Sequence, residues 1–366
     1  MRVLITGGGT GGHCTPALAV VEALRQTEPD AAVTFVGRSG GPEARIVTAA
    51  GVEFQGLTLG SMGSSRLTAT PRLLTRLPLA YAQARRIVHH FGPDVVLATG
   101  GYVSVPVALV AEQRRLPILL LEQNALPGRA VSWLAQRATQ VATSFPETAE
   151  LLRGAAVVLT GNPVRRQFVE LAPTELGALP RSLLVMGGSQ GARHLNDVLL
   201  QALPQLLSQD PELEILHLTG PLDLPRVEAA SRDLAPALAA RYRCLGFSDQ
   251  MAPLLHSAGL VVMRAGASSL AEVSCLGRPM LLVPYPHAGQ HQAANARPFA
   301  AAGAAVVVPD SELTPTAFIA EVLKILGDRQ GWEGMARASA AMARPLAAEQ
   351  VARALVEMAQ GDRHGR

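Results

Sequence analysis

The sequence predicts an α/β protein of two domains, each built on a parallel β-sheet. Short aliphatic and β-branched runs alternate with helical stretches, which is typical of strands buried on both faces of a parallel sheet. The order strand, glycine-rich turn, helix occurs twice, first in residues 2–26 and again in residues 182–203. The chain has 366 residues, which is about the length of two ordinary domains.

The first domain is expected to cover residues 1–163. Its predicted strands are 2–6, 32–36, 94–98, 118–121 and 139–143, and its first helix is 16–26. Thr15 suits the N-cap of that helix and Pro16 its first position. His13 would then lie in the loop directly before the helix. A stretch rich in Pro, Gly and charge follows near residue 162 and indicates an interdomain linker.

The second domain is expected to cover residues 164–342. Its strands are predicted at 182–186, 213–218, 259–263, 280–284 and 304–308. The alanine-rich segment at about 343–366 reads as a helix that packs back on the first domain. Because each half opens with a glycine loop, we expect the two halves to face each other across a cleft.

The composition narrows the class of protein. Apolar residues make up 48% and charged residues 17%, which argues against long disordered tails. Aromatic residues are only 4% and the net charge is +3, so no nucleic-acid partner is expected. Three cysteines far apart form no disulfide framework, which favours a reducing cytoplasm. No signal peptide or apolar run of about 20 residues is present, so we expect only peripheral membrane contact.

The two glycine loops are predicted anion sites, because unpaired N–H groups and the helix dipole attract negative charge at a helix start. In the first loop Gly7, Gly9 and Gly12 fit the dinucleotide pattern G-x-G-x-x-G. However, the second strand ends with Arg38 and no acid, so NAD fits badly and NADP fits only weakly. Two loops in two halves suit two substrates that each carry an anion.

A third motif, RAGASSLAE, lies between a strand ending near Arg264 and a helix beginning near Ser268 or Ser269. Ser269 and Glu272 form the pattern S-x-x-E, and from the residues alone a capping box is the preferred interpretation. In the alternative, the helix N-terminus binds a diphosphate and Glu272 accepts hydrogen bonds from ribose hydroxyls.

Seven motifs in order closely resemble glycosyltransferase family 28. They are GGGTGGH (7–13), GGYVSVP (100–106), LEQNALPG (121–128), GNPVR (161–165), GGSQGA (187–192), RAGASSLAE (264–272) and HQAANA (291–296). The resemblance implies the GT-B fold, in which two Rossmann-like domains face a cleft. It also implies inverting transfer of N-acetylglucosamine from UDP to the 4-hydroxyl of the muramoyl sugar of lipid I, which makes lipid II for peptidoglycan.

The resemblance also implies roles for individual residues, with the donor held mainly by the second half and the acceptor mainly by the first. The implied donor-binding residues are Thr10, Gly11, Gly12, Asn124, Arg165, Ser189, Ser248, Ser268, Ser269, Glu272 and Gln292. Among them Glu272 should hold the ribose, Asn124 and Gln292 the sugar, and the backbone of Ser248 the uracil. The acceptor side would comprise Gly9, His13, Gly100, Gly101, Tyr102 and Ser104. Helix capping is the alternative role for Tyr102 and Ser104.

The chemistry needs a base for the acceptor hydroxyl and stabilisation of the leaving UDP. His13 is the first candidate base and Glu122 the second, although His13 could instead bind an acceptor phosphate or order its loop. No Asp-x-Asp motif occurs, so we expect no metal and no other cofactor. The helix N-termini near Ser189 and Ser269, with Arg165, would then stabilise the diphosphate. His287 and His291 have no adjoining carboxylate or thiol and do not indicate a metal site.

The segment 66–86 contains arginines and leucines but no acid, and we expect it to dock on anionic lipid headgroups. A solvated helix or loop is the alternative, and Pro71 and Pro78 are expected to break any long helix there. The expected partners are UDP-N-acetylglucosamine, undecaprenyl-linked lipid I, the cytoplasmic face of the membrane and other cell-wall synthesis proteins. The competing functions are another nucleotide-sugar transferase or UDP-sugar epimerase, an NADP-linked oxidoreductase, and a non-catalytic nucleotide-sugar sensor.

Overall fold

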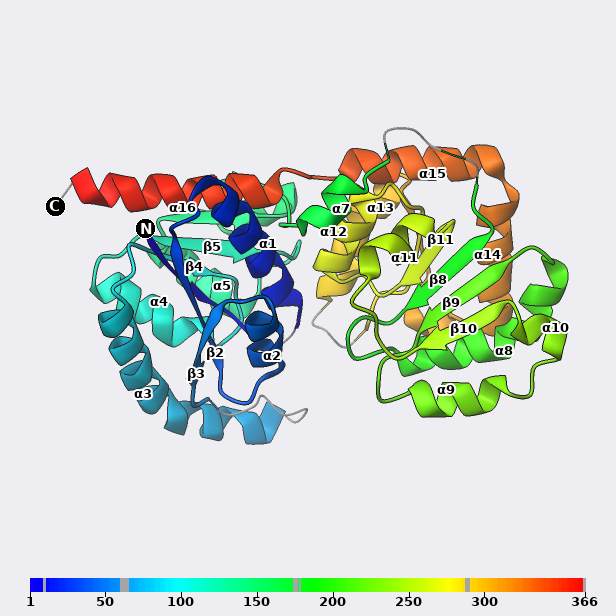
Figure 1. Ribbon diagram of the computed structural model, residues 1–366, viewed down its shortest axis with the longest axis horizontal. Helices are drawn as coiled ribbons and strands as arrows, with labels where there is room; N and C mark the ends of the chain where they lie inside the picture. The colour runs from blue at the N-terminus through cyan, green and yellow to red at the C-terminus, as the bar shows by residue number, and fades with distance from the viewer. Residues whose placement is uncertain (9–10, 60–65, 174–176, 178, 287–289, 365–366) are drawn as a thin grey trace. The chain divides into compact units, whose positions relative to one another are not determined.

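The chain forms two compact α/β units, which are described separately here (Figure 1). The computed structural model describes residues 1–8, 11–59, 66–173, 177, 179–286 and 290–364. Unit 1 comprises Met1–Arg166 and Arg344–Arg366, and unit 2 comprises Gln167–Ala343. Both units consist of a parallel sheet with helices on its two faces, which confirms the predicted fold class.

The sheet of unit 1 has seven parallel strands in the order β3-β2-β1-β4-β5-β6-β7. They are β1 (Arg2–Thr6), β2 (Ala32–Arg38), β3 (Glu53–Leu57), β4 (Val95–Ala98), β5 (Ile118–Glu122), β6 (Gln140–Thr143) and β7 (Val157–Leu159). The central strands are the ones that the sequence predicts. The two edge strands β3 and β7 were not predicted. β3 has the mixed sequence EFQGL of a partly exposed strand, and β7 is only three residues long.

Helices cover both faces of this sheet because alternate strand residues point to opposite sides. Val3 and Ile5 of β1 pack with α1 and α16, whereas Leu4 packs with α3, α4 and α5. The helical segments of unit 1 are α1 (Gly11–Thr27), α2 (Pro42–Ala49), α3 (Arg66–Phe91), α4 (Ser104–Gln113), α5 (Arg129–Leu134), η1 (Ala135–Arg137), α6 (Pro146–Leu151) and α16 (Ala347–His364). A further short helix, α7 (Arg166–Glu170), begins at the boundary between the units.

Two predictions about helices in unit 1 are wrong. Helix α1 begins at Gly11, so Pro16 lies inside it and Thr15 is not its N-cap. Helix α3 continues through Pro71 and Pro78. A proline removes one backbone hydrogen bond and costs about 3 kcal/mol in a helix interior. In α3, burial of Ala80, Ala84 and Val88 against the sheet and α4 offsets that cost, as local sequence rules do not foresee.

The sheet of unit 2 has six parallel strands in the order β10-β9-β8-β11-β12-β13. They are β8 (Ser182–Met186), β9 (Glu214–Leu218), β10 (Tyr242–Leu245), β11 (Leu260–Met263), β12 (Met280–Leu282) and β13 (Ala305–Val307). The helical segments are α8 (Arg193–Gln209), α9 (Leu224–Ser231), α10 (Pro236–Ala239), α11 (Met251–Ser257), α12 (Ala267–Cys275), α13 (His291–Ala301), η2 (Asp310–Glu312), α14 (Pro315–Gly327) and α15 (Arg329–Met342). Leu183, Val185 and Val262 of the central strands pack with α8, α14 and the buried Trp332 of α15.

Residues 343–346 connect α15 to α16, and α16 returns to unit 1, where it packs on α1 and β4. Val351, Ala352, Leu355 and Ala359 on one face of α16 are buried there. Within the described part of the chain, no helix has both the length and the apolar character needed to cross a bilayer.

Candidate active site

Each sheet has one place where the order of its strands reverses, between β1 and β4 in unit 1 and between β8 and β11 in unit 2. Loops that leave neighbouring strands in opposite directions open a crevice there, and ligands of open α/β sheets bind at this edge. The first glycine turn follows β1 and the second follows β8. Both predicted loops therefore lie at the switch point of their own unit.

In unit 1 the turns after β1 and β4 pack backbone against backbone. A side chain at Gly7 would overlap Thr99, and one at Gly101 would overlap the carbonyl oxygen of Gly8. Gly100 and Gly101 also have φ angles of 95° and 77°, which favour glycine. These four glycines are therefore required by geometry, and the edge that they form is mostly backbone.

His13 lies in the first turn of α1 and not in a loop before it. Its imidazole lies over Gly100, where an added Cβ would be 3.3 Å from its Cε1 and 3.5 Å from its Nδ1. Nδ1 is buried and has no hydrogen-bond partner among the described residues, while the residue as a whole is half-buried. The two other predicted residues of this loop, Gly9 and Thr10, lie outside the described residues.

Glu122, at the end of β5, is 1% exposed and its carboxylate accepts three hydrogen bonds. Oε1 accepts from the backbone N–H and from Nδ2 of Asn124, at 2.8 and 3.1 Å, and Oε2 accepts from the N–H of Gly128 at 2.8 Å. The carboxylate therefore orients Asn124 and closes the 124–128 turn. A group bonded in this way is not available as the acceptor of a substrate proton, which counts against Glu122 as a base.

Two polar residues hold the turns after β4 and β5 in place. Ser104 is fully buried and its hydroxyl donates to the carbonyl oxygen of Gly101 at 2.7 Å. Ser104 is the first residue of α4, whose N-cap is Val103 and which no side chain caps, so the capping role that the sequence left as an alternative for Tyr102 and Ser104 is wrong. Gln123, which the sequence analysis did not single out, is buried and donates from Nε2 to the carbonyl oxygen of Thr99 at 3.0 Å. Tyr102 is half-buried and lies between Gly101 and Ser104 in the turn after β4.

In unit 2 the turn after β8 packs on the turn after β9. Side chains at Gly187 and Gly191 would overlap the backbone of Ala192 and of Thr219 respectively. Gly188, Gly191 and Gly220 have φ angles of 82°, 76° and 84°. Ser189 is exposed on this turn, and α8 starts directly after it at Arg193. This arrangement presents a hydroxyl and unpaired backbone N–H groups, which suits a phosphate oxygen.

Helix α12 starts at Ala267 with Gly266 as its N-cap, and no side chain caps it. The preferred interpretation of the S-x-x-E pattern is therefore wrong, because Ser269 lies inside the helix and not at its N-cap. Ser268 and Ser269 are half-buried in the first turn, and Glu272 is 9% exposed one turn further on. The ligand-binding alternative for these three residues remains.

Arg264, at the end of β11, is a feature whose partners the sequence did not indicate. Its Nη1 donates to the carbonyl oxygen of Val283 at 3.0 Å and pairs with Oδ1 of Asp310 at 2.5 Å. His194 in the first turn of α8 lies 3.2 Å from the same Oδ1. Hydrogen bonds from Arg264 and His194 hold the pKa of Asp310 below its usual value, against the opposing effect of its burial. Asp310 therefore ties the start of α8 to the end of β11.

Two further predicted donor residues, Gln292 and Ser248, lie in segments of unit 2 that follow β12 and β10. Gln292, in the first turn of α13, accepts from the backbone N–H of Tyr285 at 2.8 Å. Asn295 is fully buried and donates to the carbonyl oxygen of Ala265 at 3.2 Å, which fixes α13 against the start of α12. Ser248 accepts from the N–H of Gln250 in the turn after β10. Arg165 belongs to unit 1, one residue before its boundary.

A network of buried polar side chains bonds to the backbone of Thr219, against which the second glycine turn packs. His217 of β9 is fully buried, and its two ring nitrogens lie 2.8 Å from the Tyr242 hydroxyl and 2.9 Å from Oδ1 of Asn196. Nδ2 of Asn196 donates to the carbonyl oxygen of Thr219 at 2.9 Å and to Asp223 at 2.7 Å. Burial lowers the pKa of His217 to about 4, so it is neutral at physiological pH.

No group of three or more His, Cys, Asp and Glu side chains that could hold a metal ion occurs within the described ranges. His287 lies outside them. The described groups at both edges are backbone N–H groups at helix starts, hydroxyls, amides and a few bonded charges. Such groups bind anions and sugar hydroxyls.

Comparison with known proteins identifies the class. Residues 3–143 match the glycosyltransferase family 28 N-terminal domain, and residues 182–351 match the C-terminal domain of the same family. The chain therefore belongs to glycosyltransferase family 28, whose two units form the GT-B fold.

Among curated proteins the chain is similar to UDP-N-acetylglucosamine--N-acetylmuramyl-(pentapeptide) pyrophosphoryl-undecaprenol N-acetylglucosamine transferases. It is 34% identical to that of Halothermothrix orenii over 99% of this chain and 100% of the relative. It is 38% identical to that of Syntrophotalea carbinolica over 96% and 98% respectively. Among solved structures it resembles MurG of Acinetobacter baumannii, with a TM-score of 0.76 and 29% identity over 97% of this chain and 99% of that one.

A UDP-N-acetylglucosamine 2-epimerase from Neisseria meningitidis also has a similar structure, with a TM-score of 0.67 over 98% of this chain and all of that one. Its identity is 13%, so this likeness concerns the fold alone.

Proposed function

We propose that this protein transfers N-acetylglucosamine from UDP-N-acetylglucosamine to the 4-hydroxyl of the muramoyl sugar of undecaprenyl-linked lipid I, with inversion. The observation that supports this most is similarity of 34–38% over nearly the whole chain to transferases whose names state both substrates. Glycosyl transfer by a family 28 enzyme also agrees with two anion-binding turns in two units. The product, lipid II, is a precursor of peptidoglycan.

The donor site that we propose is the carboxyl edge of the unit 2 sheet. Ser189 and the start of α12 with Ser268 and Ser269 would bind the diphosphate through hydroxyls and the positive end of the helix dipole. Glu272 would accept hydrogen bonds from the ribose, Gln292 would contact the sugar and the backbone of Ser248 the uracil. Arg165 and Asn124 of unit 1, with Gly11 and Gly12, would complete the donor contacts. The negative charge that develops on UDP would then be stabilised without a metal.

The acceptor site that we propose is the carboxyl edge of the unit 1 sheet. His13 would take the proton of the acceptor hydroxyl, since an imidazole titrates near neutral pH and this one borders the Gly100–Gly101 turn. Tyr102 and the two glycines would line the acceptor diphosphate. Glu122 would act by orienting Asn124, and Ser104 by closing the turn, without contacting substrate.

The test is UDP release by the purified protein with UDP-N-acetylglucosamine and a water-soluble lipid I analogue. We expect release that depends on both substrates and persists in a metal chelator. An epimerase would convert the donor without acceptor, and a sensor would bind the donor without releasing UDP. Nicotinamide binding without UDP affinity would favour an oxidoreductase.

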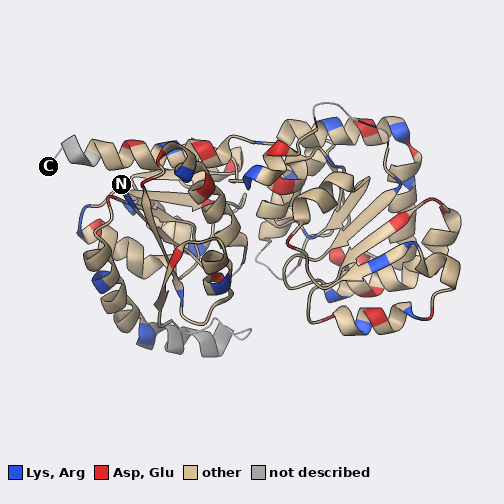
Figure 2. Ribbon diagram, viewed as in Figure 1, with Lys and Arg blue, Asp and Glu red and all other residues tan. Residues whose placement is uncertain are grey.

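We also propose that the α3–α4–α5 face of unit 1 docks on anionic lipids of the cytoplasmic membrane surface. This face is strongly cationic, as Figure 2 shows along α3. Its exposed arginines are Arg76, Arg85, Arg86, Arg114, Arg115 and Arg137. Segment 66–91 contains no acid, and Glu112, at the end of α4, pairs with Arg137 at 3.5 Å. Leu79 and Trp133 add exposed apolar side chains, at 50% and 45%.

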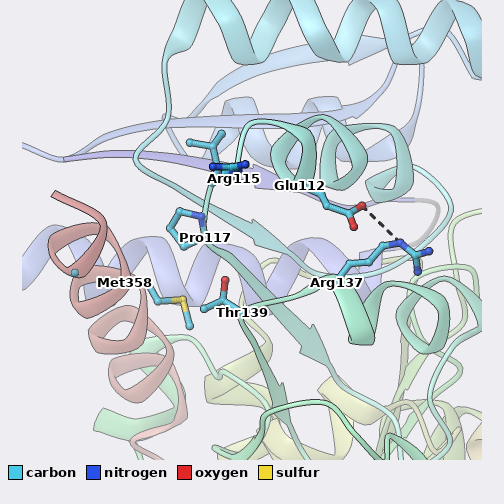
Figure 3. A pocket seen from close by; sticks show the side chains of 8 residues that line it. Glu112, Arg115, Pro117, Arg137, Thr139 and Met358 are labelled. Carbon is cyan, nitrogen blue, oxygen red and sulfur yellow. Dashed lines mark ion pairs between the residues drawn. The ribbon is translucent and has the colours of Figure 1, made fainter. Parts of the chain in front are cut away.

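Arg115 and Arg137 lie on two sides of an open pocket of about 530 Å³ beside this face (Figure 3). The pocket is also lined by Pro117, Thr139 and Met358. Cationic and apolar side chains therefore border it together, which suits the boundary between anionic headgroups and acyl chains. The guanidinium of Arg137 stacks on the indole of Trp133 with 4.0 Å to the ring centroid.

Vesicle co-sedimentation tests this docking. Replacing Arg76, Arg85 and Arg86 with Gln should weaken binding to phosphatidylglycerol vesicles by roughly a hundredfold, since each cation contributes about 1 kcal/mol. The matched control replaces two exposed arginines of unit 2, Arg232 and Arg243, and should bind as the wild type does. Equal binding to neutral and anionic vesicles would rule the docking out.

A further inference from the structure

A carboxylate that the mechanism does not use lies beneath the first glycine turn. Glu43, in the first turn of α2, is 1% exposed, although its position at a short helix start would allow it to reach solvent. Oε1 accepts from the backbone N–H of Arg38 at 2.9 Å. Oε2 is fully buried and has no hydrogen-bond partner within the described part of the chain. Burial of a carboxylate is costly, so such a group needs a reason.

Three glycines make the space for this side chain. A Cβ at Gly8 would lie 2.5 Å from Oε1, and one at Gly37 would lie 2.8 Å from Cγ of Glu43. A Cβ at Gly41 would overlap both carboxylate oxygens. Gly41 has φ −80° and ψ 160°, a conformation that any residue adopts. At Gly41, therefore, glycine is needed to leave room for the carboxylate and not for backbone freedom.

The carboxylate connects to His13 through a short series of contacts. It lies against Gly8, the carbonyl oxygen of Gly8 lies against Gly101, and Gly100 lies under the imidazole of His13. Glu43 is also near the residue that follows His13. Burial and, secondarily, the charge of Glu43 raise the pKa of the Cys14 thiol to about 12.

Glu43 reaches the end of β2, where a dinucleotide-binding enzyme places the acid that holds a ribose. The sequence showed no acid at the strand end itself. However, a ribose cannot reach a carboxylate whose free oxygen is covered by protein. The carboxylate of Glu43 is therefore placed to support the Gly8 turn and not to bind a nucleotide.

We propose that Glu43 is a positioning residue for the transfer reaction: its buried carboxylate fixes the Gly8 turn and thereby the position of His13 over Gly100. The inference rests on the role proposed for His13 above. It predicts a larger change in kcat than in donor affinity, because most of the donor contacts proposed above belong to unit 2 and only Gly11 and Gly12 belong to the segment that follows this turn.

The experiment measures UDP release and amide hydrogen exchange in the wild type, Glu43→Gln, Glu43→Ala and Gly41→Ala. We expect Glu43→Ala and Gly41→Ala each to lower kcat by roughly tenfold, with a smaller change in the KM for UDP-N-acetylglucosamine. Amides of residues 7–8 and 11–14 should exchange faster in both variants. Glu43→Gln keeps an oxygen that can accept from Arg38 and should retain more activity than Glu43→Ala. In the double variant, Gly41→Ala should add nothing further, because the group that it displaces is gone.

The matched control is Glu53→Gln, which changes a more exposed carboxylate on β3 of the same unit and should leave kcat unaltered. A folded Glu43→Ala protein with wild-type kcat and wild-type exchange would overturn the proposal. So would full additivity of the two substitutions. If the wild type itself released no UDP, the proposed function would fail, while the exchange data would still show whether Glu43 holds the turn.

Discussion

The carboxyl edges of the two sheets have the same topology but different chemistry. In unit 1 the edge is glycine backbone supported by two buried carboxylates, Glu43 and Glu122, whose bonds are internal. In unit 2 the edge presents exposed or half-exposed hydroxyls at helix starts, and of its buried charged residues Arg264 is paired with Asp310 and Glu272 lies in the second turn of α12. The first arrangement suits a site where a proton moves and hydroxyls bind, and the second suits a diphosphate. One fold thus supplies two different sites through its turns.

The largest expected effect is on proton transfer in unit 1. His13→Ala should lower kcat by roughly 10²–10⁴-fold, because general-base catalysis contributes about that much. Donor affinity, measured by calorimetry with UDP, should not change. If His13→Ala keeps nearly full kcat at saturating acceptor, the base lies elsewhere and the unit 1 edge serves for binding alone.

The next effect concerns acid stability and should be confined to unit 2. The folded pKa of His217 is about 4, below the unfolded value of 6.5, so the unfolded state binds a proton first as pH falls. The contribution of His217 to the free energy of unfolding is therefore fully present above pH 6.5. It is lost between pH 6.5 and 4, by about 3 kcal/mol in total.

The fluorescence of Trp332, which is buried in unit 2, can follow this loss in a Trp133→Phe background. His217→Gln should flatten the pH dependence between 6.5 and 4. An unchanged slope in His217→Gln would assign the acid sensitivity to another group.

A smaller effect is expected from the charge pair of unit 2. Asp310→Asn leaves the buried Arg264 without its carboxylate and should destabilise unit 2 by about 2 kcal/mol. Donor affinity should fall as well, because Asp310 joins the start of α8 to the end of β11 through His194 and Arg264. Thermal unfolding and UDP titration measure the two effects. The control Glu321→Gln keeps the shape of a half-buried side chain, weakens only a 3.8 Å pairing with the exposed Lys324, and should have a much smaller effect on both.

The smallest expected change is at the ribose. Glu272→Gln keeps the shape of the side chain but loses its charge, and should raise the KM for UDP-N-acetylglucosamine about tenfold with kcat nearly unchanged. Because Ser269 is not the N-cap of α12, Glu272→Gln removes no capping box and should not destabilise the helix in that way. Unaltered donor affinity in Glu272→Gln would show that this edge does not hold the nucleotide as proposed.

The comparison also shows why some residues could be foreseen and others could not. Glycine turns, strand periods and the motif residues are local features, so the chain itself indicated that His13, Ser189 and Glu272 lie in the segments that follow β1, β8 and β11. The partners of buried charges were not foreseen. Arg264 and Asp310 are 46 residues apart, and only the packing of β11 beside β12 and β13 brings them together. The start of α1 and the capping of α12 were predicted wrongly, because local propensities do not include the tertiary contacts of each helix.

The sequence by itself determined the fold class, the family and the identity of the residues at the two edges, because these depend on residue type, period and order along the chain. Only the tertiary structure decided what the acids do. It placed Glu43 under the Gly8 turn and bonded the carboxylate of Glu122 to the backbone N–H groups of Asn124 and Gly128. It also returned α16 to unit 1. The role of a buried carboxylate depends on which backbone N–H groups surround it, and those come from strands and turns that are distant in sequence. The first glycine loop therefore lacks the accessible acid with which a dehydrogenase holds a ribose, because the carboxylate beneath it is covered by protein.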